Sequence, residues 1–210
     1  MRVAAILLGL AIVTAAAGIG LRALAPGFDL QVMQAIALNR DKTWTNVAGI
    51  VSDGGSFALL APLSIALLLL RRWKRPADDL ALIVIAAGSA ILPIITKLIV
   101  ARPRPTIEHL SQLTSLSFPS EHTTQAAAIY LTIAILLSKD LDPRWRALLI
   151  GLAVLIGLAV AWSRVYLGVH YPTDVTAGLL LGWGWALLVF RWARPKLIED
   201  RPAMGRATHP

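Results

Sequence analysis

Long apolar runs separated by short basic clusters constrain this chain more than any other feature. A helix needs roughly 20 mostly apolar residues to cross a hydrocarbon core of about 30 Å. Soluble domains average about 25% charged residues, whereas only 15% of these 210 residues are charged and 57% are hydrophobic. The sequence therefore predicts an all-α integral membrane protein, built as a six-transmembrane-helix bundle. The predicted spans cover residues 3–25, 53–70, 79–100, 122–138, 145–162 and 173–190.

A further apolar pattern lies between the first two runs, in residues 29–44. Val32 and Ile36 are four residues apart, and so are Met33 and Ala37, which is the spacing of one helix face. This stretch is too short and too polar to be a span. It predicts a short amphipathic helix at the membrane interface.

The first run also resembles a secretory signal peptide, because Arg2 precedes it and the alanines at 15–17 resemble a cleavage site. Only one cation precedes the run, however, and its apolar character continues to Leu24, so we expect a retained span. No internal repeat or low-complexity linker divides the chain. We therefore expect one membrane domain over residues 1–198 and a short polar tail over 199–210.

Lys and Arg in short loops set the orientation of membrane helices, because they are retained on the cytoplasmic side. Of the 20 Lys and Arg residues, 13 fall on the side that holds both termini and seven on the other. We expect cytoplasmic termini, with the opposite face periplasmic or extracellular. The brevity of the chain and its lack of Cys fit a bacterial cytoplasmic (inner) membrane. The net charge of +8 does not indicate a nucleic-acid partner, because the cations lie between apolar runs.

Three polar segments fall on the outer side, at residues 97–105 (KLIVARPRP), 118–123 (FPSEHT) and 163–174 (SRVYLGVHYPTD). Residues 106–118 contain no span, so the first two segments share a side. Residues 123–162 are long enough for one helix in, a turn and one helix back. All three segments are therefore predicted to converge on one membrane face.

Ionisable side chains close to a bilayer are costly and usually functional. Cations beside a helix that begins at Ser120 would form an anion site, because free N–H groups and the helix dipole add to their charge. Histidines beside a bound phosphate suggest a nucleophile and a general acid. The ionisable residues predicted to meet there are Lys97, Arg104, His122, Arg164, His170 and Asp174.

The spacing of His170 and Asp174 carries further information. They are four residues apart, and Pro172 fits the first turn of the last span. Asp174 can then reach back to one imidazole nitrogen and fix the tautomer, which leaves the other nitrogen free to attack. Gly178 and Gly182 follow on the same helix face, a pattern typical of close helix packing.

These motifs resemble those of the type 2 phosphatidic acid phosphatase family. The family pattern is Lys, six residues, Arg-Pro; then Pro-Ser-Gly-His; then Ser-Arg, five residues, His, three residues, Asp. Ten of the eleven fixed positions agree in order and spacing, and the exception is Glu121 in place of the glycine. The matching residues are Lys97, Arg104, Pro105, Pro119, Ser120, His122, Ser163, Arg164, His170 and Asp174.

The resemblance implies a metal-independent lipid phosphatase without a cofactor. It implies that His170 attacks phosphorus to form a phosphohistidine while Asp174 orients its ring. His122 would protonate the leaving oxygen and then activate water. The groups implied to bind the phosphoryl oxygens are Lys97, Arg104, Ser120, Arg164 and the backbone at Glu121.

Two positions leave alternatives open. The Glu121 carboxylate either points away and holds Lys97 or Arg104 in place, which we favour, or repels the substrate and weakens the site. Arg102 competes with Arg104 as a phosphate ligand, and the family spacing selects Arg104. Arg102 is then expected to be an accessory cation for a diphosphate headgroup.

The expected partners are the lipid bilayer and a lipid phosphate substrate, with no obligatory protein partner. Undecaprenyl diphosphate is the preferred substrate, followed by phosphatidylglycerophosphate or phosphatidic acid. A non-catalytic binder or transporter of anionic lipids is the main alternative of another class, although it would not need the His170–Asp174 pair. A vanadium haloperoxidase, which shares the anion pocket, is disfavoured because those relatives are soluble.

Overall fold

The computed structural model describes residues 27–70, 76–105 and 116–199 and, before these, only residues 9, 13, 14, 16–20 and 23. In the last helix, side chains are described as far as Trp192. The predicted first span and the predicted tail therefore lie largely outside the described residues. The regular structure within these ranges is helical. The helices are α2 (Phe28–Leu38), α3 (Lys42–Asp53), α4 (Phe57–Leu70), α5 (Pro76–Val100), α6 (Glu121–Leu137), α7 (Pro143–Tyr166) and α8 (Pro172–Glu199).

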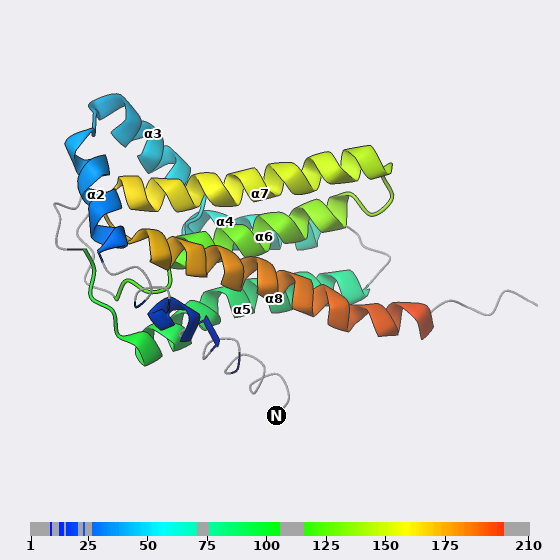
Figure 1. The fold of residues 1–210 in the computed structure, drawn as a ribbon. Helices are drawn as coiled ribbons and strands as arrows, with labels where there is room; N and C mark the ends of the chain where they lie inside the picture. Colours follow the sequence, from blue (N-terminus) through cyan, green and yellow to red (C-terminus); the bar gives the residue numbers. More distant parts are fainter. Residues whose placement is uncertain are drawn as a thin grey trace, which may run out of the picture.

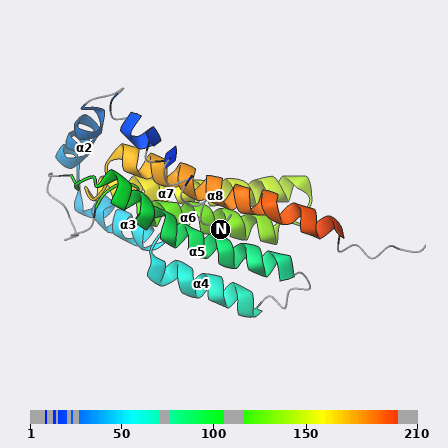
Figure 2. The same cartoon turned by 90° about the horizontal axis from the view of Figure 1, so that it is seen from below.

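Helices α4 to α8 lie side by side along one long axis, and α2 and α3 lie at one end of this bundle, as Figure 1 and Figure 2 show from two directions. Helix α6 is central, since it contacts α5, α7 and α8. Helices α5 and α7 end at the α2 end of the bundle, whereas α6 and α8 begin there (Figure 1). This alternation brings the four helix ends that carry the polar segments to one place.

Three of these helices, α5, α7 and α8, are long and apolar enough to cross a membrane. The pair α3 and α4 would add a fourth crossing as one span bent by 42°. Helix α6 has only 17 residues, or about 26 Å of helix. The described ranges thus show an all-helical membrane protein with three or four candidate spans, where the sequence predicted five in the same region.

The prediction of one amphipathic helix over 29–44 is wrong at its C-terminal end. Helix α2 ends at Leu38, and a separate helix, α3, begins at Lys42. Asp41 caps α3, because its side chain accepts a hydrogen bond from the Trp44 N–H at 2.9 Å. Such a cap satisfies a helix donor that would otherwise be unpaired. A second break, between Asp53 and Phe57, separates α3 from α4, so the predicted span 53–70 corresponds to α4.

The core of the bundle forms where α5, α6 and α8 meet. Ile85 and Leu92 of α5, Leu131 of α6 and Trp185 of α8 are buried in one apolar cluster. The Trp185 ring packs over Gly88, and its Nε1–H donates to the Ile85 carbonyl at 3.2 Å. A buried indole N–H thereby finds a partner without a polar side chain.

Helices α6 and α8 approach each other closely through glycines, as their spacing predicted. A Cβ atom at Gly182 would lie 2.4 Å from the Thr124 carbonyl oxygen and 2.8 Å from the Ala127 Cβ. A Cβ atom at Gly178 would lie 2.9 Å from the Ser120 carbonyl oxygen. At both glycines the nearest atom is a backbone carbonyl oxygen of α6 or its N-cap, which cannot move aside as a side chain can. These two glycines therefore set the distance between α6 and α8.

We predict that Gly182→Ala destabilises the fold by about 1–3 kcal/mol, the usual cost of overpacking a tight interface. For a chain of this length, each kcal/mol lowers the thermal midpoint by about 2–4 °C. Gly184→Ala is the matched control on the same helix, since nothing lies within 4 Å of a Cβ there. Thermal unfolding of both variants in detergent would check this. Equal midpoints for the two variants would contradict the packing role.

Candidate active site

The three polar segments singled out in the sequence meet at the end of the bundle beside α2. The Lys97 ammonium of α5 donates to Glu121 Oε1 of α6 at 2.6 Å. The Ser120 N–H donates to the Asp174 carbonyl oxygen at 3.2 Å. Arg104 Nη1 donates to the Val169 carbonyl oxygen at 2.7 Å. These contacts join the end of α5, the start of α6 and the turn between α7 and α8.

His170 is held by the turn that follows α7. Gly168 adopts a left-handed φ of 79°, a conformation that a residue without a Cβ reaches at little cost. The N–H groups of Val169 and His170 then both donate to the Arg164 carbonyl oxygen, at 3.2 and 3.3 Å. This folds the chain back onto the helix end, and the His170 side chain is left only 2% exposed.

The two ring nitrogens of His170 face different partners. Nδ1 lies 3.5 Å from Asp174 Oδ2, and Nε2 lies 3.4 Å from Arg104 Nη1. A guanidinium group can only donate hydrogen bonds, so we assign the proton of the neutral ring to Nδ1. The lone pair then lies on Nε2, beside a cation.

Asp174 is fully buried and its carboxylate is fixed on both oxygens. Oδ1 accepts from Arg102 Nη1 at 2.5 Å, and Oδ2 accepts from the Tyr171 N–H at 2.9 Å. Asp174 also lies in the first turn of α8, where the helix dipole favours a negative charge. The carboxylate is therefore held in one orientation next to the His170 ring.

The cations of the site are buried to different degrees and have different neighbours. Lys97 is 8% exposed and Glu121, which accepts its hydrogen bond, is 41% exposed. This contact corresponds to the favoured alternative for Glu121, in which its carboxylate holds Lys97. Arg164 is buried, and its Nη1 donates to Ser52 Oγ of α3 at 2.5 Å, while its buried Nε has no hydrogen-bond partner. An unsatisfied guanidinium N–H is suited to an anionic ligand.

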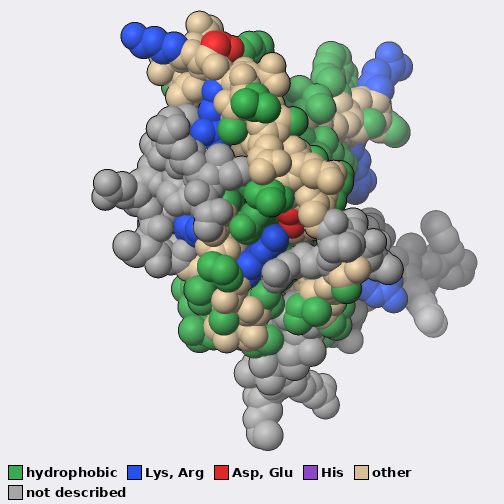
Figure 3. Space-filling model, turned by 60° about the vertical axis from the view of Figure 1, so that its left-hand side comes forward, with side chains coloured by type: hydrophobic (Ala, Val, Ile, Leu, Met, Phe, Trp, Pro, Cys, Tyr) green, Lys and Arg blue, Asp and Glu red, His purple; other side chains and the backbone are tan. Residues whose placement is uncertain are grey.

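A cleft of about 690 Å³ lies between α3 and the end of α7, and Ser52, Asp53 and Arg164 line its polar part. Figure 3 turns this end of the molecule forward and shows Lys or Arg side chains beside a carboxylate near its centre, with hydrophobic side chains among the atoms around them. Burial lowers the pKa of the Arg104 guanidinium, with Glu121 and Asp174 opposing the shift. Of the cations predicted for the site, Arg164 is the one that lines this cleft, where Asp53 lies on the same lining.

The start of α6 completes the arrangement. Ser120 is fully buried at the N-cap position, and its Oγ accepts from Thr123 Oγ1 at 3.0 Å rather than capping the helix. His122 follows in the first turn, half-buried and close enough to Arg164 and His170 for their charges to act on it. Free N–H groups of a first helix turn are anion donors.

Arg102 does not occupy the position expected for an accessory cation. Its side chain is only 5% exposed and it is paired with both Asp29 and Asp174, so it presents no open face to a second phosphate. The expectation that it binds a diphosphate headgroup is therefore wrong.

Sequence reasoning missed Asp29 and Ser52 altogether. Asp29 contacts Arg102, and Ser52 contacts Arg164. In each pair the two residues are more than 70 positions apart in sequence, so no local spacing predicts the contact. Among the described residues, no group of three or more His, Asp or Glu side chains is placed to hold a metal ion.

Comparison with known proteins gives a consistent result. The sequence profile of the PAP2 superfamily matches residues 79–198. The chain is 33% identical over 158 residues to phosphatidylglycerophosphatase B of Bacillus subtilis, covering 73% of this chain and 77% of that one. It is 30% identical over 162 residues to an undecaprenyl-diphosphatase of Sulfolobus acidocaldarius, covering 74% of each.

The fold is also similar to that of a solved structure. The crystal structure of a transmembrane PAP2-type phosphatidylglycerolphosphate phosphatase from Bacillus subtilis superposes with a TM-score of 0.77 at 29% identity, over 98% of this chain and 100% of that chain. The profile match spans the helices that carry the polar segments described above. The chain therefore belongs to the PAP2 superfamily, as a multi-pass membrane lipid phosphatase.

Proposed function

We propose that the chain hydrolyses lipid phosphate or diphosphate monoesters without a metal ion, through a phosphohistidine at His170. The observation that carries this proposal is the two-sided environment of the His170 ring. Its Nδ1 faces the Asp174 carboxylate, and its Nε2 faces Arg104. A nucleophile oriented by a carboxylate and aimed at a cationic pocket is the arrangement that phosphoryl transfer through histidine needs.

In the first step, His170 Nε2 attacks phosphorus, and the bond from phosphorus to the leaving oxygen breaks as His122 donates a proton to that oxygen. In the second step, His122 takes a proton from water, the water oxygen attacks phosphorus, and the N–P bond breaks to release inorganic phosphate. Asp174 stabilises the positive charge on the ring of His170 in the intermediate.

The oxygens of the transferring phosphoryl group carry the developing charge. Lys97, Arg104 and Arg164 are the side chains proposed to bind these oxygens, together with Ser120 and the backbone N–H of Glu121 at the start of α6. Fixed donors of this kind stabilise a transition state without reorganising during the reaction. Their partial burial makes each interaction stronger than it would be in water.

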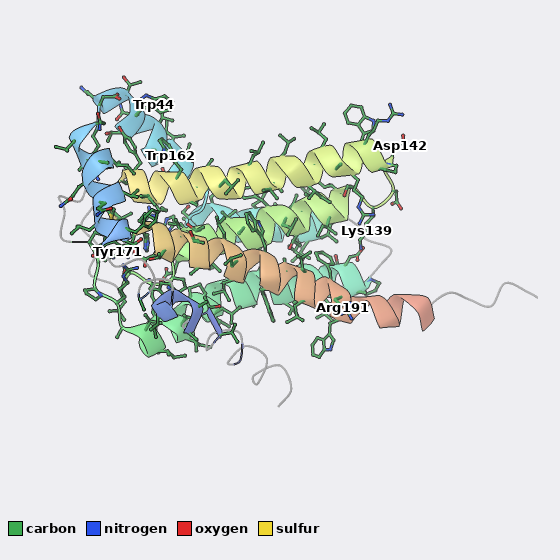
Figure 4. All side chains as sticks on the ribbon, in the orientation of Figure 1. Trp44, Lys139, Asp142, Trp162, Tyr171 and Arg191 are labelled. Carbon is green, nitrogen blue, oxygen red and sulfur yellow. The ribbon has the colours of Figure 1, made fainter. Side chains whose placement is uncertain are left out.

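A lipid tail has a place beside this site. An apolar cleft of about 810 Å³ lies on α2, α3 and α7 and is lined mainly by Val32, Ile36, Trp44, Trp162 and Tyr166. Trp44 and Trp162 meet edge to face at 5.9 Å, and Figure 4 shows both at the same end of the bundle as Tyr171. We propose that a substrate whose phosphate reaches Arg164 leaves its chain on this surface, because residues of α3 and α7 line both clefts.

Undecaprenyl diphosphate is our proposed substrate, and the similarity to an undecaprenyl-diphosphatase supports it. Phosphatidylglycerophosphate is the second candidate, because the chain is also similar in sequence and fold to phosphatases of that lipid. Phosphatidic acid is a further monoester that the same pocket would accept. The pocket would recognise the phosphate that all three lipids share. The tail and the headgroup charge would therefore determine the preference among them.

We further propose that residues 1–198 form one domain with six spans in a bacterial cytoplasmic membrane. Helix α6 would be a short span inside the bundle, and the run over 3–25 would be the first. The bias of Lys and Arg supports cytoplasmic termini. The site then opens on the periplasmic or extracellular face.

The decisive test is phosphate release by detergent-purified protein in EDTA, with undecaprenyl diphosphate, phosphatidylglycerophosphate and phosphatidic acid compared. We expect release from undecaprenyl diphosphate to be fastest, to survive EDTA, and to vanish in His170→Ala. Folded protein that releases phosphate from none of these lipids would favour the anionic-lipid binder. Unchanged activity in His170→Asn would rule out the phosphohistidine.

The protonation state of His170 gives a second prediction. Burial lowers the pKa of its imidazole from 6.5 to about 4, and Asp174 opposes this shift. A nucleophilic ring must be neutral, and above about pH 5 this one is. In a ¹⁵N NMR titration, the signals absent from His170→Ala should shift near pH 4 and stay constant through neutral pH. A midpoint near 6.5 would contradict the buried environment.

Glu121 gives a third prediction, since its carboxylate neutralises Lys97 at 2.6 Å. Glu121→Gly should release the ammonium while leaving the histidines in place. We expect KM or the preference among lipids to change by about two- to fivefold, as for a partly exposed ion pair, with kcat largely retained. Steady-state kinetics on two lipids would measure this. Complete loss of activity would show that Glu121 has a role beyond binding.

A further inference from the structure

A buried chain of charged groups extends from α2 to the proposed nucleophile. Arg102 Nη2 donates to Asp29 Oδ2 at 2.7 Å, and its Nη1 donates to Asp174 Oδ1 at 2.5 Å. Asp174 in turn faces the ring of His170. We propose that Asp29 and Arg102 are positioning residues, which hold the Asp174 carboxylate and through it the ring of His170 in the orientation needed for attack. This inference rests on the proposed function.

Both terminal nitrogens of Arg102 donate to protein groups. Besides the two carboxylates, its Nη1 donates to Thr173 Oγ1 at 2.8 Å, and its guanidinium carbon lies 3.7 Å from the centre of the Tyr171 ring. The planar guanidinium fork can bridge two carboxylates while stacking on an aromatic ring, which an ammonium group cannot do. Arg102 therefore acts on the site through Asp174 rather than on the substrate.

Asp29 connects three segments that are far apart in sequence. It lies in the first turn of α2, and its Oδ2 accepts from Thr173 Oγ1 at 2.6 Å as well as from Arg102. Its Oδ1 accepts from the Thr173 N–H at 3.0 Å. Asp29 thus fixes the start of α8, one residue before Asp174, together with the segment that carries both Arg102 and Arg104.

The charge balance gives Asp29 a second effect. Two carboxylates around one guanidinium leave one net negative charge next to a ring that becomes positive in the phosphohistidine. Without Asp29, the remaining pair would be neutral. Removing one partner of a buried ion pair also leaves its counterpart uncompensated.

The test compares kcat and KM of Asp29→Asn and Arg102→Lys with those of the wild type. Asp29→Asn keeps the shape and removes the charge, while Arg102→Lys keeps the charge and removes the bridge. Small displacements of a reacting group cost about 10- to 100-fold in rate, so we expect kcat to fall by that factor. KM should change by less than about threefold, because neither residue contacts the substrate.

A matched control lies at the opposite end of the bundle. Lys139 donates to the buried carboxylate of Asp78, and Figure 4 shows Lys139 far from Tyr171. Lys139→Gln breaks a comparable ion pair, so it should lower the thermal midpoint and leave kcat unchanged. Variants of Asp29 and Arg102 that behave in the same way, with a lower midpoint and wild-type kcat, would overturn the positioning role.

A second readout does not depend on activity. ¹⁵N NMR of the His170 ring should show the Nδ1–H tautomer in the wild type and a mixture of tautomers in Arg102→Lys. An unchanged tautomer would count against the proposal. If the wild type released no phosphate from any lipid, the proposed function would fail, and this spectrum would still decide whether Arg102 orients the ring through Asp174.

Discussion

The burial of the Asp174 carboxylate is the constraint on which the rest of this end of the molecule depends. A charge without access to water must be satisfied by donors that the fold supplies. Arg102 comes from the segment after α5 and the Tyr171 N–H from the turn before α8. These hydrogen bonds hold the segment after α5 against the start of α8. Asp29, which also binds Arg102, connects α2 to the same cluster. The site residues therefore lie close together because the buried Asp174 carboxylate needs donors from several segments.

The pocket also balances its own positive charge. Lys97, Arg104 and Arg164 lie together, and each would raise the energy of the others if no anion were present. Glu121 pairs with Lys97, and Arg164 donates to the neutral Ser52. A carboxylate at the position where the family pattern has glycine therefore offsets the positive charge of Lys97. In the proposed mechanism, a substrate phosphate that binds Lys97 competes with this interaction.

The sequence predicted the parts of the fold that have a period or a fixed spacing. The apolar runs at 79–100, 145–162 and 173–190 are helices, and the glycines at 178 and 182 do mark a close contact. At the break between α2 and α3, the Asp41 side chain caps α3, a feature that hydropathy does not register. Arg102 and Asp29 were misassigned or missed because a pair of charges more than 70 residues apart has no local pattern. The motifs predict which residues react, whereas no motif predicts the groups that surround them.

The close contact of α6 and α8 has an electrostatic consequence. Both helices begin at the site and run in the same direction (Figure 1), and Gly178 and Gly182 allow their backbones to touch. Each helix start carries about half an elementary charge, so two starts side by side approach the charge of one additional cation. Unlike the charge of a lysine ammonium group, the charge of a helix start does not titrate, and its use in binding costs no side-chain conformational entropy. The close approach allowed by two glycines thus brings two helix dipoles to the same place, where Asp174 and Glu121 lie in the first turns, and the charge of these dipoles is independent of pH.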